Sequence, residues 1–343
     1  MSSNIQYNTK IVNIWLKGSI FLIFVMVIVG GLTRLTDSGL SITEWELFSG
    51  IIPPLSTTEW NNYFNEYKKI PQYQLLFPGM SLDEFKYIFF WEYFHRLLGR
   101  IIGLFFIIPL LYFTFTRTIK INYLYTFYFV FLLICLQGFF GWYMVQSGLV
   151  HDVTVSHYRL SIHLFTAVLI ISILYWNYLC LSKNNNQNFF SKDRGYLLLK
   201  IFFLLILIQV ILGAFVSGLD AGSIYQTWPK MNNTFFPDDT NFSNIYDLLN
   251  FENHSLVQFY HRNLAYVIFF YFCFITYKFF KKKIIIDKKI FLVVSIILLI
   301  QILLGIITLI SGLNIYLAIF HQIFSLLLVL SVLRLNFFSA KQY

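Results

Sequence analysis

The chain has 343 residues, of which 58% are hydrophobic and only 12% are charged. So apolar a composition excludes an ordinary soluble domain and indicates a protein that crosses a membrane several times. The net charge of +9 would suit nucleic-acid binding. The basic residues, however, are spread over short segments between apolar stretches, so we expect a lipid bilayer and no nucleic acid as the surroundings.

Eight apolar stretches are each long enough to cross a bilayer, which takes about 20 residues in a helix. They cover residues 11–32, 87–115, 123–145, 158–181, 195–216, 256–277, 290–310 and 316–335. We therefore predict an all-α integral membrane protein with eight transmembrane helices. The first stretch lacks a small-residue cleavage site after a short apolar region, so we expect it to be retained.

The charges predict the topology. Lysines and arginines gather around residues 10–17, 117–120, 183–194, 278–289 and 334–341, whereas acidic residues gather in 37–84 and 220–252. Basic loops stay in the cytoplasm. Both termini are therefore predicted on the cytoplasmic side, with the two long loops outside.

The chain also repeats itself. Residues 30–39 align without gaps on 213–222, residues 90–96 match 256–262, and His163 corresponds to His321. We predict two tandem four-helix bundles, residues 1–181 and 195–343, joined by a cytoplasmic linker over 182–194. Because four is an even number, both bundles enter the membrane from the same side.

A Gln-x-x-x-Gly pattern recurs in the apolar spans. It begins at Gln137, Gln209 and Gln301. We interpret it as close helix packing through glycine with an interhelical hydrogen bond.

Four histidines lie at matched depth in alternate spans: His95, His163, His261 and His321. At ~1.5 Å per residue they are expected in one layer, roughly 8–12 Å below the outer surface. A single histidine in an apolar helix is more often a hydrogen-bonded core residue, but four paired by a duplication favour a ligand role. Two facing imidazoles in a four-helix bundle suit a haem iron. Zinc is disfavoured because each half supplies only two histidines.

The remaining histidines and the cysteines are interpreted as structural. His151, His157 and His254 lie just outside the apolar spans and are expected to be interfacial. Cys135, Cys180 and Cys273 all fall within predicted spans, so no disulfide or cysteine metal site is implied. Three arginines near the predicted ligands are candidates for haem propionates, with snorkelling toward headgroups as the alternative: Arg96, Arg159 and Arg262.

Glu92 breaks the symmetry of the repeat. It stands three residues before His95, on the same helix face, whereas the second half has Gln258 at that place. An amide cannot transfer a proton as a carboxylate can. The first half is therefore the predicted site of chemistry and the second an electron-transfer site. The alternative is that Glu92 merely pairs with Arg96 or Arg100.

The first long loop contains a predicted helix. Residues 56–59 have the spacing of a capping box, and Trp60, Tyr63, Phe64 and Tyr67 share one helical face. We expect a short amphipathic helix at the membrane surface.

Several motifs resemble those of the haem A synthase family of the alphaproteobacterial and mitochondrial type. They are GGLTRLTDSGLS (30–41), Trp45, Gly50, PP (53–54), EFKYIFFWEYFHR (84–96), YRLSIHL (158–164), GLDAG (218–222), TWP (227–229), QFYHR (258–262) and HQ (321–322). The resemblance covers about the whole chain. Leu47 and Gln226 depart from it, where a proline and an asparagine are expected, and a cysteine pair that some members carry in the first outer loop is absent.

The resemblance implies an enzyme that oxidises the methyl group of haem O to the formyl group of haem A, for a haem-copper cytochrome oxidase. Beside this resemblance, the difference between Glu92 and Gln258 leads us to predict that His95 and His163 flank the substrate haem with Glu92 near its reacting edge, and that His261 and His321 hold a resident haem b. The resemblance also implies a bacterial or mitochondrial inner membrane, and as partners the haem O synthase, oxidase assembly factors and an electron donor.

Two other classes of function remain open at this stage. A di-haem b electron carrier would use the same four histidines but would give Glu92 no role. A transporter built from parallel repeats would explain the duplication without needing the histidines.

Overall fold

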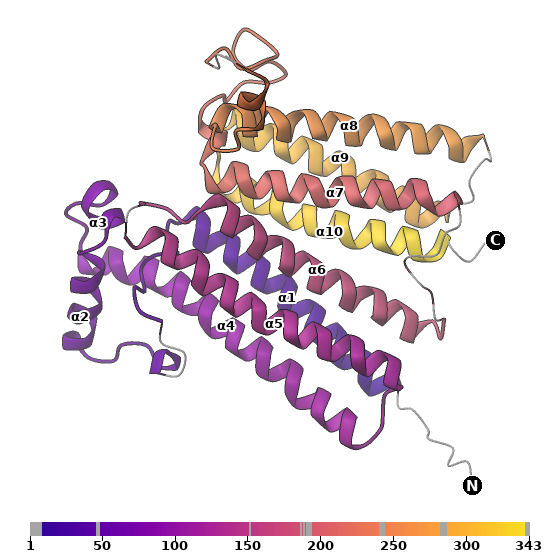
Figure 1. Ribbon diagram of the computed structural model, residues 1–343, viewed down its shortest axis with the longest axis horizontal. Helices are drawn as coiled ribbons and strands as arrows, with labels where there is room; N and C mark the ends of the chain where they lie inside the picture. Colours follow the sequence, from indigo (N-terminus) through magenta and orange to yellow (C-terminus); the bar gives the residue numbers. More distant parts are fainter. Residues whose placement is uncertain are drawn as a thin grey trace. The chain divides into compact units, whose positions relative to one another are not determined.

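The structure is a computed structural model that describes residues 9–45, 49–150, 152–185, 187, 189, 194–239, 244–281 and 287–339. Within these residues it is helical, with one isolated bridge between Met231 and Thr234 and no strand. Eight of the described helices are long and apolar enough to cross a membrane (Figure 1). The prediction of an all-α membrane protein is confirmed.

Each predicted span lies inside one observed helix. The eight long helices are α1 (Thr9–Leu35), α4 (Leu82–Phe115), α5 (Ile121–Gly148), α6 (His157–Ser182), α7 (Arg194–Gly218), α8 (His254–Phe280), α9 (Lys288–Ile310) and α10 (Ile315–Ser339). The shorter elements are η1 (Ser49–Ile51), α2 (Thr57–Tyr67), α3 (Pro71–Leu76), η2 (Ala221–Ser223) and η3 (Ile245–Leu249).

Capping explains why α4 begins before its apolar stretch. The Ser81 hydroxyl accepts a hydrogen bond from the backbone N–H of Glu84, and the Glu84 carboxylate accepts one from the backbone N–H of Ser81. This capping box satisfies two of the free N–H groups at the helix start. It adds one polar turn that hydropathy does not detect.

The chain divides into two compact units, an N-terminal unit up to Leu174 and a C-terminal unit from Tyr175. In the N-terminal unit, α4 packs against α1, α2 and α5. In the C-terminal unit, α7 packs against α8 and α10, and α9 packs against α10, so that these helices lie side by side (Figure 1). The predicted tandem duplication and its limits, 1–181 and 195–343, stay predictions.

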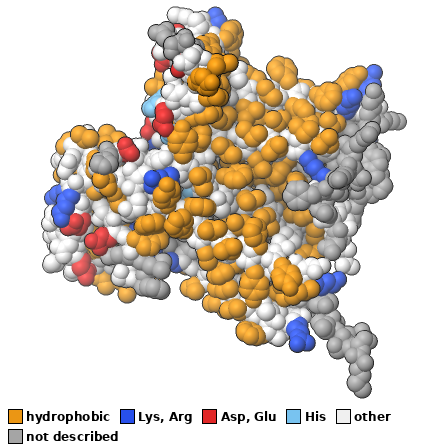
Figure 2. Space-filling model, viewed as in Figure 1, with side chains coloured by type: hydrophobic (Ala, Val, Ile, Leu, Met, Phe, Trp, Pro, Cys, Tyr) orange, Lys and Arg blue, Asp and Glu red, His pale blue; other side chains and the backbone are white. Residues whose placement is uncertain are grey.

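The exposed faces of the long helices are apolar. Side chains such as Phe21, Leu104, Ile108 and Phe270 each expose more than half of their surface. Figure 2 shows hydrophobic side chains covering much of the face that it draws. A soluble protein rarely exposes so continuous an apolar surface, whereas hydrocarbon chains solvate it.

The helix predicted in the first long loop is α2, and its capping box at Ser56 and Glu59 is confirmed. Its aromatic face packs on the protein. Phe64 and Tyr67 are buried against Phe85 of α4, with ring centroids 5.0 and 5.3 Å away. The face finds a protein surface because α4 extends beyond its apolar stretch. That α2 lies at the membrane surface stays a prediction. The loop segment thus forms a cap on the end of α4 (Figure 1).

Candidate functional site

His95 of α4 and His163 of α6 face each other in the N-terminal unit. Their ring centroids are 6.3 Å apart and the ring planes are inclined by 50°. The Nδ1 atoms of both rings are buried and have no hydrogen-bond partner among the described residues. Such buried unpaired polar atoms are uncommon and call for an explanation. A metal ion bound at about 2 Å to one nitrogen of each ring would place the two ring centroids roughly as far apart as observed.

The C-terminal unit holds a corresponding pair. His261 of α8 and His321 of α10 lie near enough to interact electrostatically. Their Nδ1 atoms are likewise buried without a partner in the part of the chain that the structure describes. Each unit therefore brings together the two histidines that the sequence paired. That all four form one layer stays a prediction.

Each of these imidazoles lies directly against a glycine of another helix. A Cβ atom added to the glycine would lie 2.9–3.3 Å from the histidine Cε1. The contacts join Gly30 to His95, Gly141 to His163, Gly213 to His261 and Gly305 to His321. Distances of this kind are shorter than ordinary carbon–carbon contacts, so a larger residue would displace the ring.

The Gln-x-x-x-Gly pattern places a glutamine one turn before three of these glycines. The Gln137 amide donates to the main-chain oxygen of His163 at 2.8 Å, and the Gln209 amide donates to that of His261 at 3.0 Å. The Gln301 amide nitrogen lies 3.4 Å from the His321 Nε2. The interpretation as glycine packing with an interhelical hydrogen bond is confirmed. The sequence did not reveal that each of these glutamines contacts the helix turn that carries a predicted ligand histidine.

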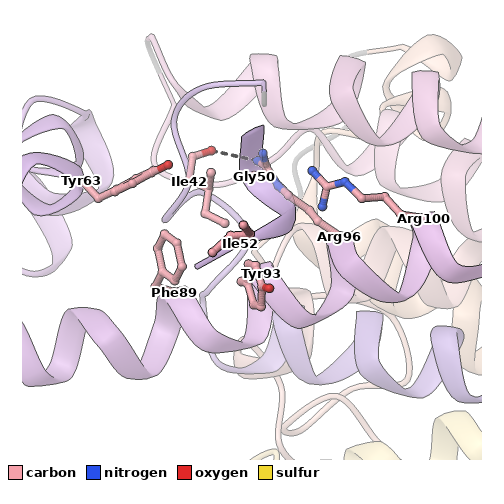
Figure 3. Close-up of a pocket in the computed structure, with 8 residues that line it drawn as sticks. All are labelled: Ile42, Gly50, Ile52, Tyr63, Phe89, Tyr93, Arg96 and Arg100. Atoms are coloured by element: carbon pink, nitrogen blue, oxygen red, sulfur yellow. Dashed lines mark hydrogen bonds between the residues drawn. The ribbon is translucent and has the colours of Figure 1, made fainter. Parts of the chain in front are cut away.

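Glu92 is buried and its carboxylate joins α4 to the loop after α1. One carboxylate oxygen accepts from the Ser41 hydroxyl at 2.7 Å and from the backbone N–H of Ile42 at 2.8 Å. The other accepts from two nitrogens of Arg96, at 2.6 and 3.1 Å. Arg96 in turn donates to the Ile42 oxygen, drawn as a dashed line in Figure 3. We call Glu92, Arg96, Ser41 and Ile42 the Glu92 clamp.

The C-terminal unit contains the same arrangement with an amide. Gln258 donates to the Tyr225 oxygen at 2.9 Å, and Arg262 donates to that oxygen at 2.7 Å and to the Thr227 oxygen at 2.8 Å. Tyr225 corresponds to Ile42 when the offset that aligns residues 30–39 with 213–222 is continued beyond them. The glutamate-to-glutamine difference therefore changes which backbone atom of the loop is held: Glu92 holds an N–H and Gln258 a C=O.

All three candidate propionate-binding arginines contact main-chain oxygens. Arg96 and Arg262 bind the outer loops as described, and Arg96 also reaches the Glu44 oxygen at 3.0 Å. Arg159 donates to the Tyr143 oxygen, and its guanidinium lies 3.7 Å from the centroid of the Tyr143 ring. These contacts hold the ends of helices and loops. The role of the three guanidiniums toward propionates stays a prediction.

A small pocket missed by the sequence analysis lies beside the Glu92 clamp (Figure 3). Its lining comes from α4, α2, the loop after α1 and the segment around η1: Ile42, Gly50, Ile52, Tyr63, Phe89, Tyr93, Arg96 and Arg100. The four α4 residues recur at helical spacing, which could have indicated a shared face. The segment from the loop could not have been placed by any local pattern.

The other histidines divide into different environments. His254 is exposed, as expected for an interfacial residue. His157 is 5% exposed and its ring lies tilted against that of Tyr158, with centroids 4.0 Å apart, so the interfacial interpretation is wrong for this residue. His151 and Leu47 lie outside the described residues. The three cysteines lie within α5, α6 and α8 and are free thiols.

Comparison with known proteins identifies the family. The sequence profile of the cytochrome oxidase assembly protein family matches residues 13–333. A haem A synthase of Pelagibacter ubique is 50% identical over 94% of both chains. Haem A synthases of Parvibaculum lavamentivorans and Rickettsia felis are 45% and 39% identical, over 74% and 92% of this chain and 73% and 94% of their own. The chain belongs to the haem A synthase family. The resemblance stated from the motifs is thereby confirmed.

One departure from the haem A synthase motifs falls within the described residues. Gln226 is exposed in the loop after η2, and its side-chain oxygen would lie 3.8 Å from a Cβ atom at Gly312. Among the described residues, no hydrogen bond or glycine contact joins Gln226 or Gly312 to His261 or His321. This departure is therefore a matter of loop geometry and leaves the histidine pair of this haem A synthase family member untouched.

Proposed function

We propose that this protein is a haem A synthase, a membrane enzyme that oxidises the methyl group of haem O to the formyl group of haem A. The observation that carries the proposal is the pairing, in each unit of a chain that belongs to this family, of two histidines whose Nδ1 atoms are buried. A di-haem b electron carrier is less favoured, because the relatives named above are haem A synthases.

The residues present fit a haem in each unit. Facing imidazoles with unpaired Nδ1 atoms, seated against glycines, are suited to be axial ligands in a helix bundle. In this proposal His95 and His163 hold the substrate haem, and His261 and His321 hold a resident haem b. Haem b supplies one-electron transfer when bound.

The protein's own groups then orient the substrate. His95 and His163 would hold the haem iron, while the Glu92 clamp fixes the outer loop beside the same turn of α4. All four hydrogen bonds to the carboxylate come from protein donors, so we propose that Glu92 acts on the site through Arg96 and the loop. Its direct catalytic role stays a prediction. Arg96, Arg159 and Arg262 are proposed to bind propionates at the outer ends of the helices.

Localisation and partners follow from the same proposal. We expect the bacterial inner membrane, or the mitochondrial one in a eukaryote, with both termini on the cytoplasmic side. The proposed substrate and product are haem O and haem A. The expected protein partners are a haem O synthase, oxidase assembly factors and an electron donor.

The test is expression in a bacterial host that makes haem O and lacks its own haem A synthase. Haem extracted from the membranes of cells that express the wild-type protein should include haem A. Membranes of cells that express the variant His95→Ala should yield none. Variant His254→Ala, in which an exposed histidine is removed, is the matched control and should support normal haem A formation. Folded wild-type protein that carries haem b and yields no haem A would refute the proposal and favour an electron carrier.

A further inference from the structure

The helix contacts that seat the four histidines are not equivalent. Three of the four glycines are preceded, four residues earlier, by a glutamine whose amide reaches the neighbouring histidine or its main-chain oxygen. Before Gly30 that position is Met26. A thioether donates no hydrogen bond. The turn that carries His95 therefore lacks the glutamine contact that the other three histidines have.

The position of Met26 is otherwise comparable. Gly30 approaches the His95 ring as closely as the other glycines approach theirs, with a built Cβ 3.0 Å from Cε1. The Met26 methyl group lies against α4 at Gly99, 3.4 Å from a Cβ built there. Gly99 is one turn beyond His95. The end of the Met26 side chain therefore lies against α4 one turn beyond His95. We expect a glutamine at this position to reach the main-chain oxygen of His95.

Although α1 and α4 pack against each other, the hydrogen bond between them near His95 is weak. The Thr33 hydroxyl lies 3.3 Å from the Trp91 oxygen, one turn from His95, but it also donates to the Val29 oxygen of its own helix at 2.9 Å. One hydrogen is shared between two acceptors, with the shorter bond inside α1. By contrast, Gln137 and Gln209 give their neighbouring helices short bonds at the histidine itself.

A substrate haem must enter and leave, whereas a resident haem need not. From the missing glutamine contact we infer that His95 is the iron ligand that dissociates during substrate exchange. Its turn of α4 moves away from the iron to admit haem O and release haem A. Met26 is the positioning residue that permits this movement. The inference rests on the proposed function. It gives a second reason, independent of Glu92, why the N-terminal unit is the substrate half, since both histidines of the C-terminal unit have glutamines.

The test measures haem loss from purified protein to an excess of a haem-scavenging apoglobin, with the released haem identified by mass. Wild-type protein should lose haem O or haem A faster than haem b. Variant Met26→Gln should slow the fast loss about fivefold, which is the ~1 kcal/mol of one added hydrogen bond at 1.4 kcal/mol per tenfold. Variant Met26→Leu, which adds no donor, is the control and should keep the fast loss.

The converse variant protects the test against misfolding of Met26→Gln. Gln209→Met removes the glutamine contact from His261 and should speed the loss of haem b by a similar factor, with the unfolding midpoint of each variant measured in parallel. Unchanged loss rates in both Met26→Gln and Gln209→Met would overturn the inference while leaving the proposed function intact. Wild-type protein that holds no haem O or haem A in a haem O-producing host would refute the proposed function, and this inference with it.

Discussion

Replacing Glu92 by glutamine tests how much the Glu92 clamp contributes to stability and to haem A formation. The carboxylate accepts four hydrogen bonds, two from Ser41 and Ile42 and two from Arg96. A glutamine offers one oxygen, so its NH₂ group must face two of these donors and leave them unpaired. With side chains only 4% and 12% exposed, Glu92 and Arg96 gain little help from water.

The magnitude follows from these lost bonds. Breaking a buried ion pair costs about 3–5 kcal/mol, a figure that already includes the donors left unpaired. Arg96 keeps its bonds to the Ile42 and Glu44 oxygens, which lowers the total. We expect Glu92→Gln to lower the free energy of unfolding by about 2–4 kcal/mol. The haem A yield should disappear while both haems stay bound.

Two controls separate the contributions. Ser41→Ala removes one hydrogen bond, costs about 1 kcal/mol and leaves the carboxylate with Arg96, so it should keep most of the activity. Glu66→Gln removes a carboxylate from an exposed pair with Lys69. It should change the free energy of unfolding by no more than about 0.5 kcal/mol and leave haem A formation unchanged. The assays are thermal unfolding in detergent and haem A formed per folded protein. Full activity of Glu92→Gln with an unchanged unfolding midpoint would refute the reasoning.

Two further predictions concern the glycine contact and the cap on α4. Gly305→Ala places a methyl group 2.9 Å from the His321 Cε1 and should weaken haem b binding by about 1–3 kcal/mol, seen as an altered low-spin haem spectrum. Gly138→Ala, where a Cβ meets nothing within 4 Å, should leave the spectrum unchanged. Burial, followed by the charges of Asp37 and Glu92, raises the pKa of Tyr67 above its ordinary value of 10.0. The stability from its hydrogen bond to Gln72 should therefore persist below about pH 10 and fall as the pH rises further; Tyr67→Phe should abolish this alkaline dependence, and an identical pH profile in the variant would contradict the assignment.

The sequence predicted the helices well because bilayer-spanning segments leave a long hydropathy pattern. All eight predicted spans fall inside observed helices. The ends were less accurate where a polar turn precedes the apolar stretch, as at Ser81 and Glu84. Helix α3 was missed because its six residues carry no periodicity, although Pro71 at its start is a common first residue.

The site was predicted in part. Pairing His95 with His163 required only the order of spans and the repeat, and the structure brings their rings together. Glycine contacts with the rings depend on how two helices are rotated against each other, which no local pattern fixes. The same holds for Glu92: its spacing to Arg96 was visible in the sequence, but its bonds to Ser41 and Ile42 depend on the path of a loop.

The most direct test of the account is to identify which haem each histidine pair holds. Protein purified from cells that make haem O would be compared with the variants His163→Ala and His321→Ala, and the extracted haems identified by chromatography and mass spectrometry. The account predicts that His163→Ala loses haem O and haem A but keeps haem b, and that His321→Ala loses haem b. Loss of the same haem from both variants, or of none from either, would contradict it.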